Sequence, residues 1–549
     1  MTITRRRFLA GTSLAAGAAM AGALPGGRPA VAAAGLTPFV DRLPVPPPAK
    51  PVGKALVGPY PTADVYRMTV GTLAHRFHRD LPLSTVWGYN GSYPGPTISA
   101  VSGRPLYVQW VNGLPNAPHP LWSPAFAAAH GPGIGGTSPD AARTVAHLHG
   151  GRVPPDADGW PEEIVLPGRS TKPYLYPNFQ EAATLWYHDH ALGITRLNVM
   201  MGLAGAYVIK DGWENALPLP KGAYDVPLIV QDRMLTSLGR ISYPLDLAPE
   251  FFGDVNVVNG KVWPYLDVAR GKYRFRVVNG CNSKFLDLAF ADGRAFAQIA
   301  SDQGLLPAPE IRTSVRLAPG ERVEIVADFQ RDRPGAGIVL VNRLAPAPYP
   351  GGGNAAVPEN VMAFRVGSAY GHTAALPTKL RTVLPSVPQQ TRWTTSQYLE
   401  KIPESAAKAT RRFTLIEATN TGTAICVNAG GFTPAIRDEA GKIQWSDPLP
   451  FKVKAGDVEI WEFTNETVDT HPVHVHLAQM QLLGRISPPG TPAAGSAEGP
   501  GVVKDTWQLH PGETIRLIGR FEGYPGKYAF HCHILEHEDC EMMRWFELV

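Results

Sequence analysis

The sequence predicts an all-β protein built from three β-sandwich domains in tandem. The first observation is composition, because 56 glycines and 54 prolines in 549 residues suit many short strands joined by turns. Long stretches of helical periodicity are hard to find. The second observation is a pair of strand markers that occurs three times, and such recurrence indicates related domains. A chain of this length has room for about three to four domains of roughly 150 residues.

The first marker is a glycine followed by alternating apolar residues and closed by an asparagine, at residues 103–112, 271–279 and 456–465. The second is a Pro-Gly turn that leads into another alternating strand. Its copies are at 167–168, 319–320 and 511–512, ahead of strands expected at 172–176, 323–329 and 515–521. Alternation with a period of two predicts half-buried strands. Ordinary β-sheet punctuation could mimic one pair of markers, but three ordered pairs favour a repeat.

Breaks between the repeats suggest the domain boundaries. We expect a first domain at residues 35–212, a second at 213–369, a linker at 370–411 and a third domain at 412–549. The Pro-rich residues 35–60 should form an extended arm over the first domain. The Gly-, Pro- and Ala-rich residues 487–501 should form a surface loop in the third.

Residues 1–34 have the pattern of a twin-arginine signal peptide. Three arginines at 5–7 precede an Ala/Gly-rich apolar stretch at 11–23, and three alanines at 32–34 form a small-residue cleavage site. A transmembrane anchor is the alternative, but the apolar run is short and glycine-rich, which favours cleavage. We therefore expect a protein exported by the twin-arginine machinery, secreted or at the cell envelope, without stable membrane insertion after cleavage.

The charge of the chain gives no indication of a polyanionic partner. The chain has 51 basic and 47 acidic residues. Residues 1–34 contain four arginines and no acidic residue, so the rest of the chain has 47 of each. The mature chain is therefore close to neutral, which argues against binding to nucleic acid or to a membrane surface.

Four cysteines are few for an exported chain. Cys281 and Cys426 could form a disulfide in an oxidising compartment, although the sequence does not show that they meet. Cys540 is expected to be a small buried hydrophobic residue, because it lacks the flanking histidines of Cys532.

The C-terminal peptide His531-Cys532-His533 carries the strongest chemical signal. The residues before it alternate as in a strand, so Cys532 should face one side while the two histidines face the other. On the first side, a thiolate with His537 and Met542 supplies three groups of a blue-copper site, which needs one more histidine. The simpler interpretation is a core cysteine between two hydrogen-bonded histidines. That interpretation must explain several soft or borderline ligands in one short run, so we give it little weight.

Three more histidine clusters lie in the terminal domains, and none lies in the middle one. Together the four clusters hold ten of the sixteen histidines. One His-x-His pair is weak evidence, but four clusters and a cysteine are strong. Ligands from the first and third domains can meet only if those domains face each other, which makes the middle domain a structural bridge. The three clusters are His147 and His149, His188 and His190, and His471, His474 and His476.

These four motifs, in this order, resemble the copper motifs of the multicopper oxidases. The resemblance covers essentially the whole mature chain and is strongest to bacterial spore-coat laccases, with bilirubin oxidases and phenoxazinone synthases as further relatives. It implies cupredoxin-like Greek-key sandwiches. It also implies four copper ions as cofactors, one of type 1, one of type 2 and two of type 3.

The resemblance also implies which residues bind each ion. The type 1 ion would be bound by His471, Cys532 and His537 with Met542 axial, and the type 2 ion by His147 and His474. The type 3 ions would be bound by His149, His188 and His533 and by His190, His476 and His531. Part of this follows from strand geometry alone, because His474 and His476 share one face.

The reaction implied is the oxidation of phenols, aminophenols or related aromatics coupled to reduction of dioxygen to water. Dioxygen takes four electrons whereas such donors give them up singly, so electrons must be collected at one site and delivered together at another. In the family, Cys532 and its flanking histidines would carry them. An exposed edge of His471 or His537 would receive them from a donor at the surface.

Two acidic residues match family positions implicated in proton supply. These are Glu538, directly after a type 1 ligand, and Asp158, nine residues beyond His149. The alternative is that each carboxylate only fixes an imidazole tautomer, and both interpretations stay open.

Three other functions compete with this one. Oxidation of Cu(I) or Mn(II) is a rival, although only ten methionines, with none in the 487–501 loop, argue against a cuprous oxidase with a Met-rich insert. A fungal-type bilirubin oxidase would have a tryptophan where Val468, Asp469 and Thr470 stand. A non-enzymatic exported cupredoxin-fold scaffold would lose copper ligands, and here all are kept.

Overall fold

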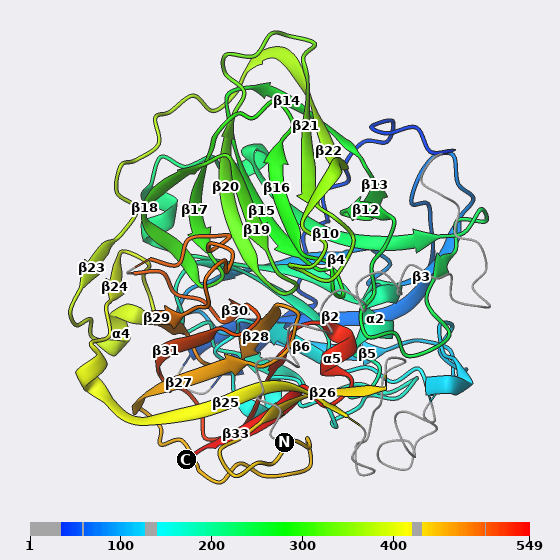
Figure 1. The fold of residues 1–549 in the computed structure, drawn as a ribbon. Helices are drawn as coiled ribbons and strands as arrows, with labels where there is room; N and C mark the ends of the chain where they lie inside the picture. Colours follow the sequence, from blue (N-terminus) through cyan, green and yellow to red (C-terminus); the bar gives the residue numbers. More distant parts are fainter. Residues whose placement is uncertain (1–34, 58–59, 127–139, 420–430, 500) are drawn as a thin grey trace, which may run out of the picture.

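The computed structural model describes residues 35–57, 60–126, 140–419, 431–499 and 501–549 (Figure 1). The strands form three pairs of sheets, one pair in each predicted domain, and the all-β prediction is confirmed. A hydrophobic core fills each pair. Figure 1 shows the second sandwich above the other two. The domain boundaries themselves stay predictions.

The first sandwich consists of one sheet ordered β1-β2-β5-β7, with β3 on β2, and one ordered β4-β9-β8-β6. Its strands are β1 (Gly53–Val57), β2 (Tyr60–His75), β3 (Ser84–Tyr89), β4 (Gly95–Val101), β5 (Leu106–Asn112), β6 (Ala146–His149), β7 (Tyr174–Tyr176), β8 (Ala183–Asp189) and β9 (Ala204–Lys210).

The second sandwich has a sheet ordered β13-β12-β10-β15-β20-β17-β18, with β11 on β10, and one ordered β14-β22-β21-β16-β19. Its strands are β10 (Asp225–Leu235), β11 (Ile241–Ser242), β12 (Val255–Val258), β13 (Lys261–Val262), β14 (Tyr265–Arg270), β15 (Lys272–Asn279), β16 (Leu286–Phe290), β17 (Phe296–Ser301), β18 (Gly304–Arg312), β19 (Ser314–Leu317), β20 (Arg322–Asp328), β21 (Gly337–Leu344) and β22 (Asn354–Tyr370).

The third sandwich pairs a sheet ordered β26-β25-β27-β31-β29 with one ordered β30-β28-β32-β33. Its strands are β25 (Ala407–Thr419), β26 (Phe432–Arg437), β27 (Val458–Asn465), β28 (His471–Val475), β29 (Met480–Ile486), β30 (Thr506–Leu509), β31 (Thr514–Arg520), β32 (Gly526–Cys532) and β33 (Met543–Leu548).

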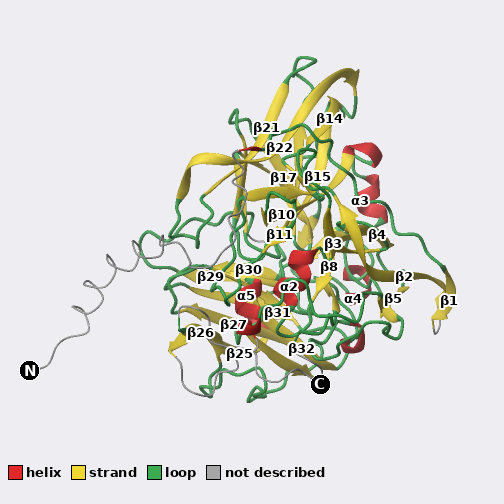
Figure 2. Cartoon of the chain, turned by 90° about the vertical axis from the view of Figure 1, so that its right-hand side faces the viewer, coloured by secondary structure: helices red, strands yellow, loops and turns green. Residues whose placement is uncertain are grey.

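The helices are short. They are α2 (Thr195–Met201), α3 (Gly212–Ala216), α4 (Gln389–Arg392) and α5 (Leu535–Glu538), with the 3-10 turns η4 (Pro155–Ala157), η5 (Gly222–Tyr224) and η6 (Glu404–Ala406). Figure 2 shows α2 beside α5. Asp539, just after α5, accepts hydrogen bonds of 2.9 Å from the backbone N–H groups of Thr195 and Arg196. None of the described helices is long and apolar enough to cross a membrane.

The predicted repeat is visible in the strand pairing. The two marker strands are antiparallel neighbours in all three sandwiches, as β5 with β7, β15 with β20 and β27 with β31. The first marker strand also has a parallel neighbour each time, namely β2, β10 and β25. The three domains therefore share one core topology.

The asparagine that closes each marker strand explains why the marker is recognisable. Asn112, Asn279 and Asn465 each donate two side-chain hydrogen bonds to backbone carbonyls and accept one from the backbone N–H two residues later. The backbone carbonyl of each also accepts the N–H of the glycine in the Pro-Gly turn. That glycine has a φ of 77°, 84° or 70°, a region that other residues rarely adopt.

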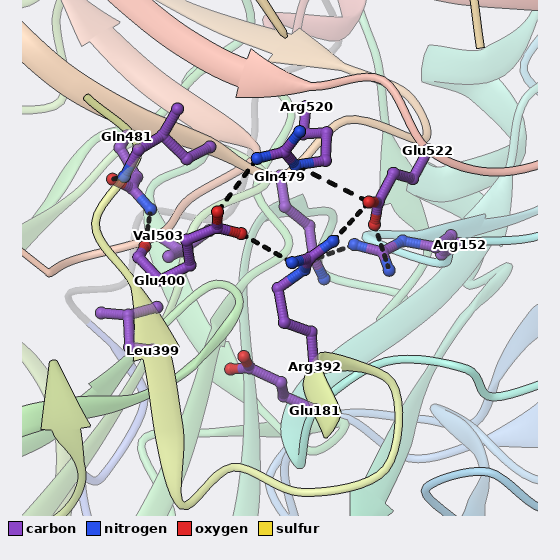
Figure 3. Close-up of a pocket in the computed structure, with 11 residues that line it drawn as sticks. Arg152, Glu181, Arg392, Leu399, Glu400, Gln479, Gln481, Val503, Arg520 and Glu522 are labelled. Atoms are coloured by element: carbon purple, nitrogen blue, oxygen red, sulfur yellow. Dashed lines mark hydrogen bonds and ion pairs between the residues drawn. The ribbon is translucent and has the colours of Figure 1, made fainter. Parts of the chain in front are cut away.

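The predicted linker has structure of its own. β22 and β25 extend into residues 370–411, and between them β23 (Thr382–Leu384) pairs in parallel with β24 (Tyr398–Glu400). Figure 3 shows how this segment is held at a small polar pocket between the terminal domains. Arg392 forms ion pairs with Glu400 and with Glu522 of the third domain, and Glu400 pairs with Arg520.

Three expectations about the arm and the cysteines need correction. The N-terminal arm contacts the first domain through Ala49, but Phe39 and Leu43 donate backbone hydrogen bonds to residues of the second, and Leu43 enters its core. The Cys281–Cys426 disulfide is wrong, because Cys281 is a free thiol; Cys426 lies outside the described residues. Cys540 is disulfide-bonded, so it is more than a small buried hydrophobic residue.

Candidate metal centre

Two neighbouring strands, β28 and β32, carry four of the twelve candidate ligands, and these four are divided between two sites. They are antiparallel, with Val473 opposite Cys532 and His474 opposite His531. Val473 and Cys532 face the core of the third sandwich, whereas His474 and His531 face the histidines of the first domain. The predicted two-sided placement of the His-Cys-His peptide is therefore confirmed. One strand pair serves two separate sites.

The first site lies inside the third sandwich. Cys532 Sγ is 3.4 Å from His471 Nδ1 and 3.8 Å from His537 Nδ1, and the three residues form one candidate metal group. Met542 is fully buried in the same core. The backbone N–H of Ile534 donates a 3.4 Å hydrogen bond to Sγ, which stabilises a thiolate there. The chain thus brings together all four residues predicted for a blue-copper site.

The predicted exposed edge on this site is wrong. His471 is 0% exposed and His537 is 3% exposed. Nε2 of His471 lies 2.6 Å from Thr467 Oγ1, and His537 hydrogen-bonds to the backbone carbonyl of Pro249. Thr467 therefore contacts the His471 nitrogen that does not face Cys532, and Pro249 contacts the His537 ring. Neither could be anticipated from the motifs.

The second site gathers eight histidines at the junction of the first and third domains. They come from β6, from β8 and the residue after it, from β28 and the residue after it, and from β32 and the residue after it. β6 and β8 are antiparallel with His147 opposite His188. The all-histidine candidate metal groups are His147, His149 and His474; His149, His188 and His533; and His190, His476 and His531, and a further group joins Asp158 to His147 and His476. All eight residues are fully buried.

The nitrogens of this site are arranged for a metal rather than for one another. Nε2 atoms of His190, His476 and His531 lie 3.2–3.3 Å apart, so three lone pairs or protons converge on one point. Among the described residues, no hydrogen-bond partner exists for Nε2 of His147, His188 and His474, for Nδ1 of His149, or for either nitrogen of His533. Buried nitrogens without partners are costly, and copper suits imidazole and thiolate donors. The residues present therefore fit copper.

Backbone carbonyls fix the orientation of several of these rings. Nδ1 of His147, His188, His474 and His531 lies 2.6–3.0 Å from a carbonyl oxygen of Asp158, Asp189, Asp505 and Cys532 respectively. A proton on Nδ1 leaves Nε2 free to bind a metal. The strand backbone thereby selects the tautomer.

The two predicted acids lie around the histidine cluster and contact Nδ1 atoms of ligand histidines. Asp158 Oδ2 lies 2.7 Å from His476 Nδ1. The two Glu538 oxygens lie 3.2 Å from Nδ1 of His190 and of His531, at ion-pair distance but without hydrogen-bond geometry. Burial raises the pKa of Glu538 well above its usual value, with Asp539 adding to the shift. Asp158 is thus placed to orient the His476 ring, and Glu538 lies beside two rings.

Sequence reasoning missed Asp505. Its Oδ1 lies 3.1 Å from His149 Nε2, and Thr506 Oγ1 lies 3.1 Å from the same nitrogen. Asp505 follows the 487–501 loop and belongs to no histidine motif, so only the fold brings it to the site.

We expect copper loading to displace few protons. Burial, followed for most by neighbouring imidazoles, lowers the pKa of nine of the ten ligand histidines. Nine imidazoles with an ordinary pKa of ~6.5 would release roughly seven protons at about pH 6. Here the release should be about one to two, chiefly from the Cys532 thiol, whose pKa burial raises.

Calorimetric titration of the metal-free protein with copper, in buffers of different ionisation enthalpy, measures this number. Replacing Cys532 with Ser should remove about one proton from it. A release near seven would show that the histidines are solvated rather than held neutral.

Comparison with known proteins supports the chemistry of these sites. A family model described as multicopper oxidase matches residues 412–548, and a second with the same description matches residues 75–123 and 141–213. The chain is 37% identical to a laccase of Bacillus subtilis, over 93% of this chain and 98% of the relative. It is 36% identical to a laccase of Haloferax volcanii, over 98% and 90%.

A solved structure of a laccase from Pediococcus acidilactici matches with a TM-score of 0.72 at 25% identity, covering 94% of this chain and 95% of that one. A variant of a multicopper oxidase from Aquifex aeolicus matches with a TM-score of 0.72 at 26% identity, covering 92% of this chain and 99% of that one. These relatives confirm the cupredoxin-like fold and the resemblance to bacterial laccases. The chain belongs to the multicopper oxidase family and is a copper-dependent oxidoreductase that uses dioxygen as its acceptor.

Proposed function

We propose that the protein is an exported laccase-type oxidase that takes single electrons from phenols, aminophenols or related aromatics and reduces dioxygen to water. The observation that carries this proposal is the position of Cys532. It belongs to the first site, and both residues bonded to it in the chain, His531 and His533, belong to the second. A covalent path of a few bonds therefore joins the two sites.

We propose four copper ions, bound as the family resemblance implies. His471, Cys532, His537 and Met542 hold the type 1 ion. The histidine groups of the second site support a trinuclear cluster, with His149, His188 and His533 on one type 3 ion and His190, His476 and His531 on the other. His147 and His474 hold the type 2 ion. When bound, copper supplies one-electron acceptance at the first site and dioxygen reduction at the second.

The protein residues around the cluster orient ligands, exclude water and hold protons. The complete burial of the eight histidines excludes bulk water. Asp158 and Glu538 touch Nδ1 of ligand histidines, which supports a role in orienting them. We also propose that they supply protons to the cluster, since they are the acids predicted for it and both lie beside it.

Copper analysis tests the centre of this proposal. The wild-type chain should bind four copper ions and show the blue absorption of a Cys–Cu bond. Cys532→Ser should lose that absorption, one copper ion and oxygen consumption with aromatic donors. Cys281→Ser is the matched control, because Cys281 is also a buried free thiol and lies in the middle domain, so it should retain all three.

Far fewer than four copper ions in the fully loaded wild type would overturn the assignment. So would a blue, active Cys532→Ser variant. Absence of oxygen consumption with any easily oxidised donor would favour the scaffold function.

Oxidation of cationic donors, including Cu(I) or Mn(II), is a second candidate that one feature favours. Glu250 follows the Pro249 carbonyl bonded to His537, and Asp469 lies two residues before His471. Glu250, Asp469 and Glu417 interact electrostatically, and each has a pKa raised first by burial. Once ionised, which for Asp469 needs a pH above its raised pKa of about 6, carboxylates this close in sequence to His471 would attract a positive donor.

Donor charge separates the two candidates. Above pH 6, Asp469→Asn should lower the rate with Cu(I) by roughly fivefold, the equivalent of ~1 kcal/mol for unit charges about 4 Å apart in water, and the rate with divalent Mn(II) by more. The rate with a neutral phenol should not change. Asp328→Asn, an exposed acid of the middle domain, is the control and should leave every rate unchanged. Equal rates with cationic donors in the wild type and Asp469→Asn would exclude this attraction.

We propose export by the twin-arginine route on the sequence of residues 1–34, which lie outside the described residues. Replacing Arg5 and Arg6 with Lys should leave the protein inside the cell with its signal uncleaved. Cell fractionation with immunoblotting measures this, and a fully exported double variant would contradict it.

A further inference from the structure

The middle domain reaches the histidine cluster, although it provides none of the ligands. The turn glycine Gly320 packs directly against two of the rings. A Cβ atom at Gly320 would lie 2.8 Å from Cδ2 and Cγ of His533 and 3.1 Å from Cε1 of His149. The middle domain therefore forms one wall of the cluster.

Arg322, two residues further on, uses all five of its N–H groups. Nε donates to the carbonyl of Thr184, and the two terminal nitrogens donate to the carbonyls of Gly320 and Asp302. Each terminal nitrogen also donates to one oxygen of Asp505 at 2.6 Å. The acceptors come from all three domains, and Arg322 is fully buried. Such a forked pair fixes the plane of the carboxylate.

Asp505, held in this way, contacts two ligand histidines. Its Oδ1 lies 3.1 Å from His149 Nε2, and its backbone carbonyl lies 2.9 Å from His474 Nδ1. Gln303, also from the middle domain, donates a 2.5 Å hydrogen bond to Oδ2. Gln303 in turn accepts a hydrogen bond of 2.8 Å from Gln479, a residue of the polar pocket in Figure 3.

His149 presents the opposite nitrogen from its neighbours. Histidines 147, 188, 474, 476 and 531 have Nδ1 facing an oxygen, which leaves Nε2 for a metal. In His149 it is Nε2 that faces Asp505, and Nδ1 has no partner among the described residues. The His149 ring also stacks on His474, with centroids 3.7 Å apart and planes at 13°. A misplaced Asp505 would therefore disturb both rings.

We propose that Arg322 is a positioning residue of the trinuclear site. It holds Asp505 so that His149 keeps its proton on Nε2 and offers Nδ1 to copper. The middle domain is thus part of the metal site, beyond the bridging role predicted for it. This inference rests on the proposed function, because it assumes that His149 and His474 bind copper.

The same contact explains the glycine of the His147-Leu148-His149-Gly150 motif. A Cβ atom at Gly150 would lie 2.5 Å from Arg322 Nη2 and 2.8 Å from Asp505 Oδ2. Only glycine leaves room for the Arg322–Asp505 pair at this point. Gly150→Ala should therefore disturb the pair without changing its charges.

The test compares Arg322→Lys with the wild type and with Arg276→Lys. Lysine keeps the charge but cannot form the fork. Arg276 is a matched control, since it is buried in the middle domain and paired with Glu214, Asp225 and Glu324, but touches no ligand histidine. The measurements are copper ions per chain, blue absorption, the type 2 electron paramagnetic resonance spectrum and thermal unfolding.

We expect Arg322→Lys to bind copper at the cluster about 10- to 100-fold more weakly and to show altered type 2 hyperfine splitting. Its blue absorption should be unchanged, because the type 1 ligands do not contact Asp505. Arg276→Lys should keep the wild-type blue absorption and type 2 spectrum, although its unfolding temperature should be comparable to that of Arg322→Lys. Gly150→Ala should reproduce the spectral change if it folds, which gives a second variant that retains Arg322.

Unchanged copper content and type 2 spectrum in Arg322→Lys would overturn the inference. So would an equal loss in Arg276→Lys, because Arg322 would then serve only to hold the fold together. A wild-type chain that binds no copper would instead refute the proposed function, so the two failures can be told apart.

Discussion

The pairing of β28 with β32 is the constraint on which both sites depend. Side chains alternate along a strand, so one strand can present ligands to two different environments. The register that sets Val473 opposite Cys532 also sets His474 opposite His531. A shift by one residue would move Cys532 to the domain interface and two ligand histidines into the apolar core. The distance between the sites is thus fixed by hydrogen bonds of the sheet rather than by loops.

This arrangement has a cost that the metal offsets. Ten buried imidazoles and a buried thiol would each be destabilising if charged or without a partner. The protein itself provides an oxygen for one nitrogen of many of these rings. The oxygens come from backbone carbonyls and from the carboxylates of Asp158, Glu538 and Asp505. The other nitrogen is left for copper. Burial lowers the pKa of nine of these imidazoles and so favours the neutral form, which binds a metal.

Much of this architecture could be predicted from the sequence, because it rests on local patterns. The three marker pairs predicted strands that the structure shows as paired neighbours, since alternation and turn glycines act over a few residues. Alternation likewise places His474 and His476 on one face of their segment, whereas the meeting of the two domains depends on packing. Contacts between distant segments could not be predicted. Thr467 over His471, Pro249 beside His537 and the Arg322–Asp505 pair carry no signature in their own surroundings.

The repeat shows how such a contact arises without a motif of its own. Each sandwich has the same Pro-Gly turn, bonded to the same asparagine, at Gly168, Gly320 and Gly512. A Cβ atom would meet nothing within 4 Å at Gly168 and only Pro488 at Gly512, whereas at Gly320 it would meet His533 and His149. The turn is therefore a folding device in all three domains and a wall of the metal cluster in one. Because the turn sequence is shared, only the packing of the domains distinguishes these roles. Arg322 follows the one turn that faces the histidines, and there a residue can act on the metal site without belonging to it.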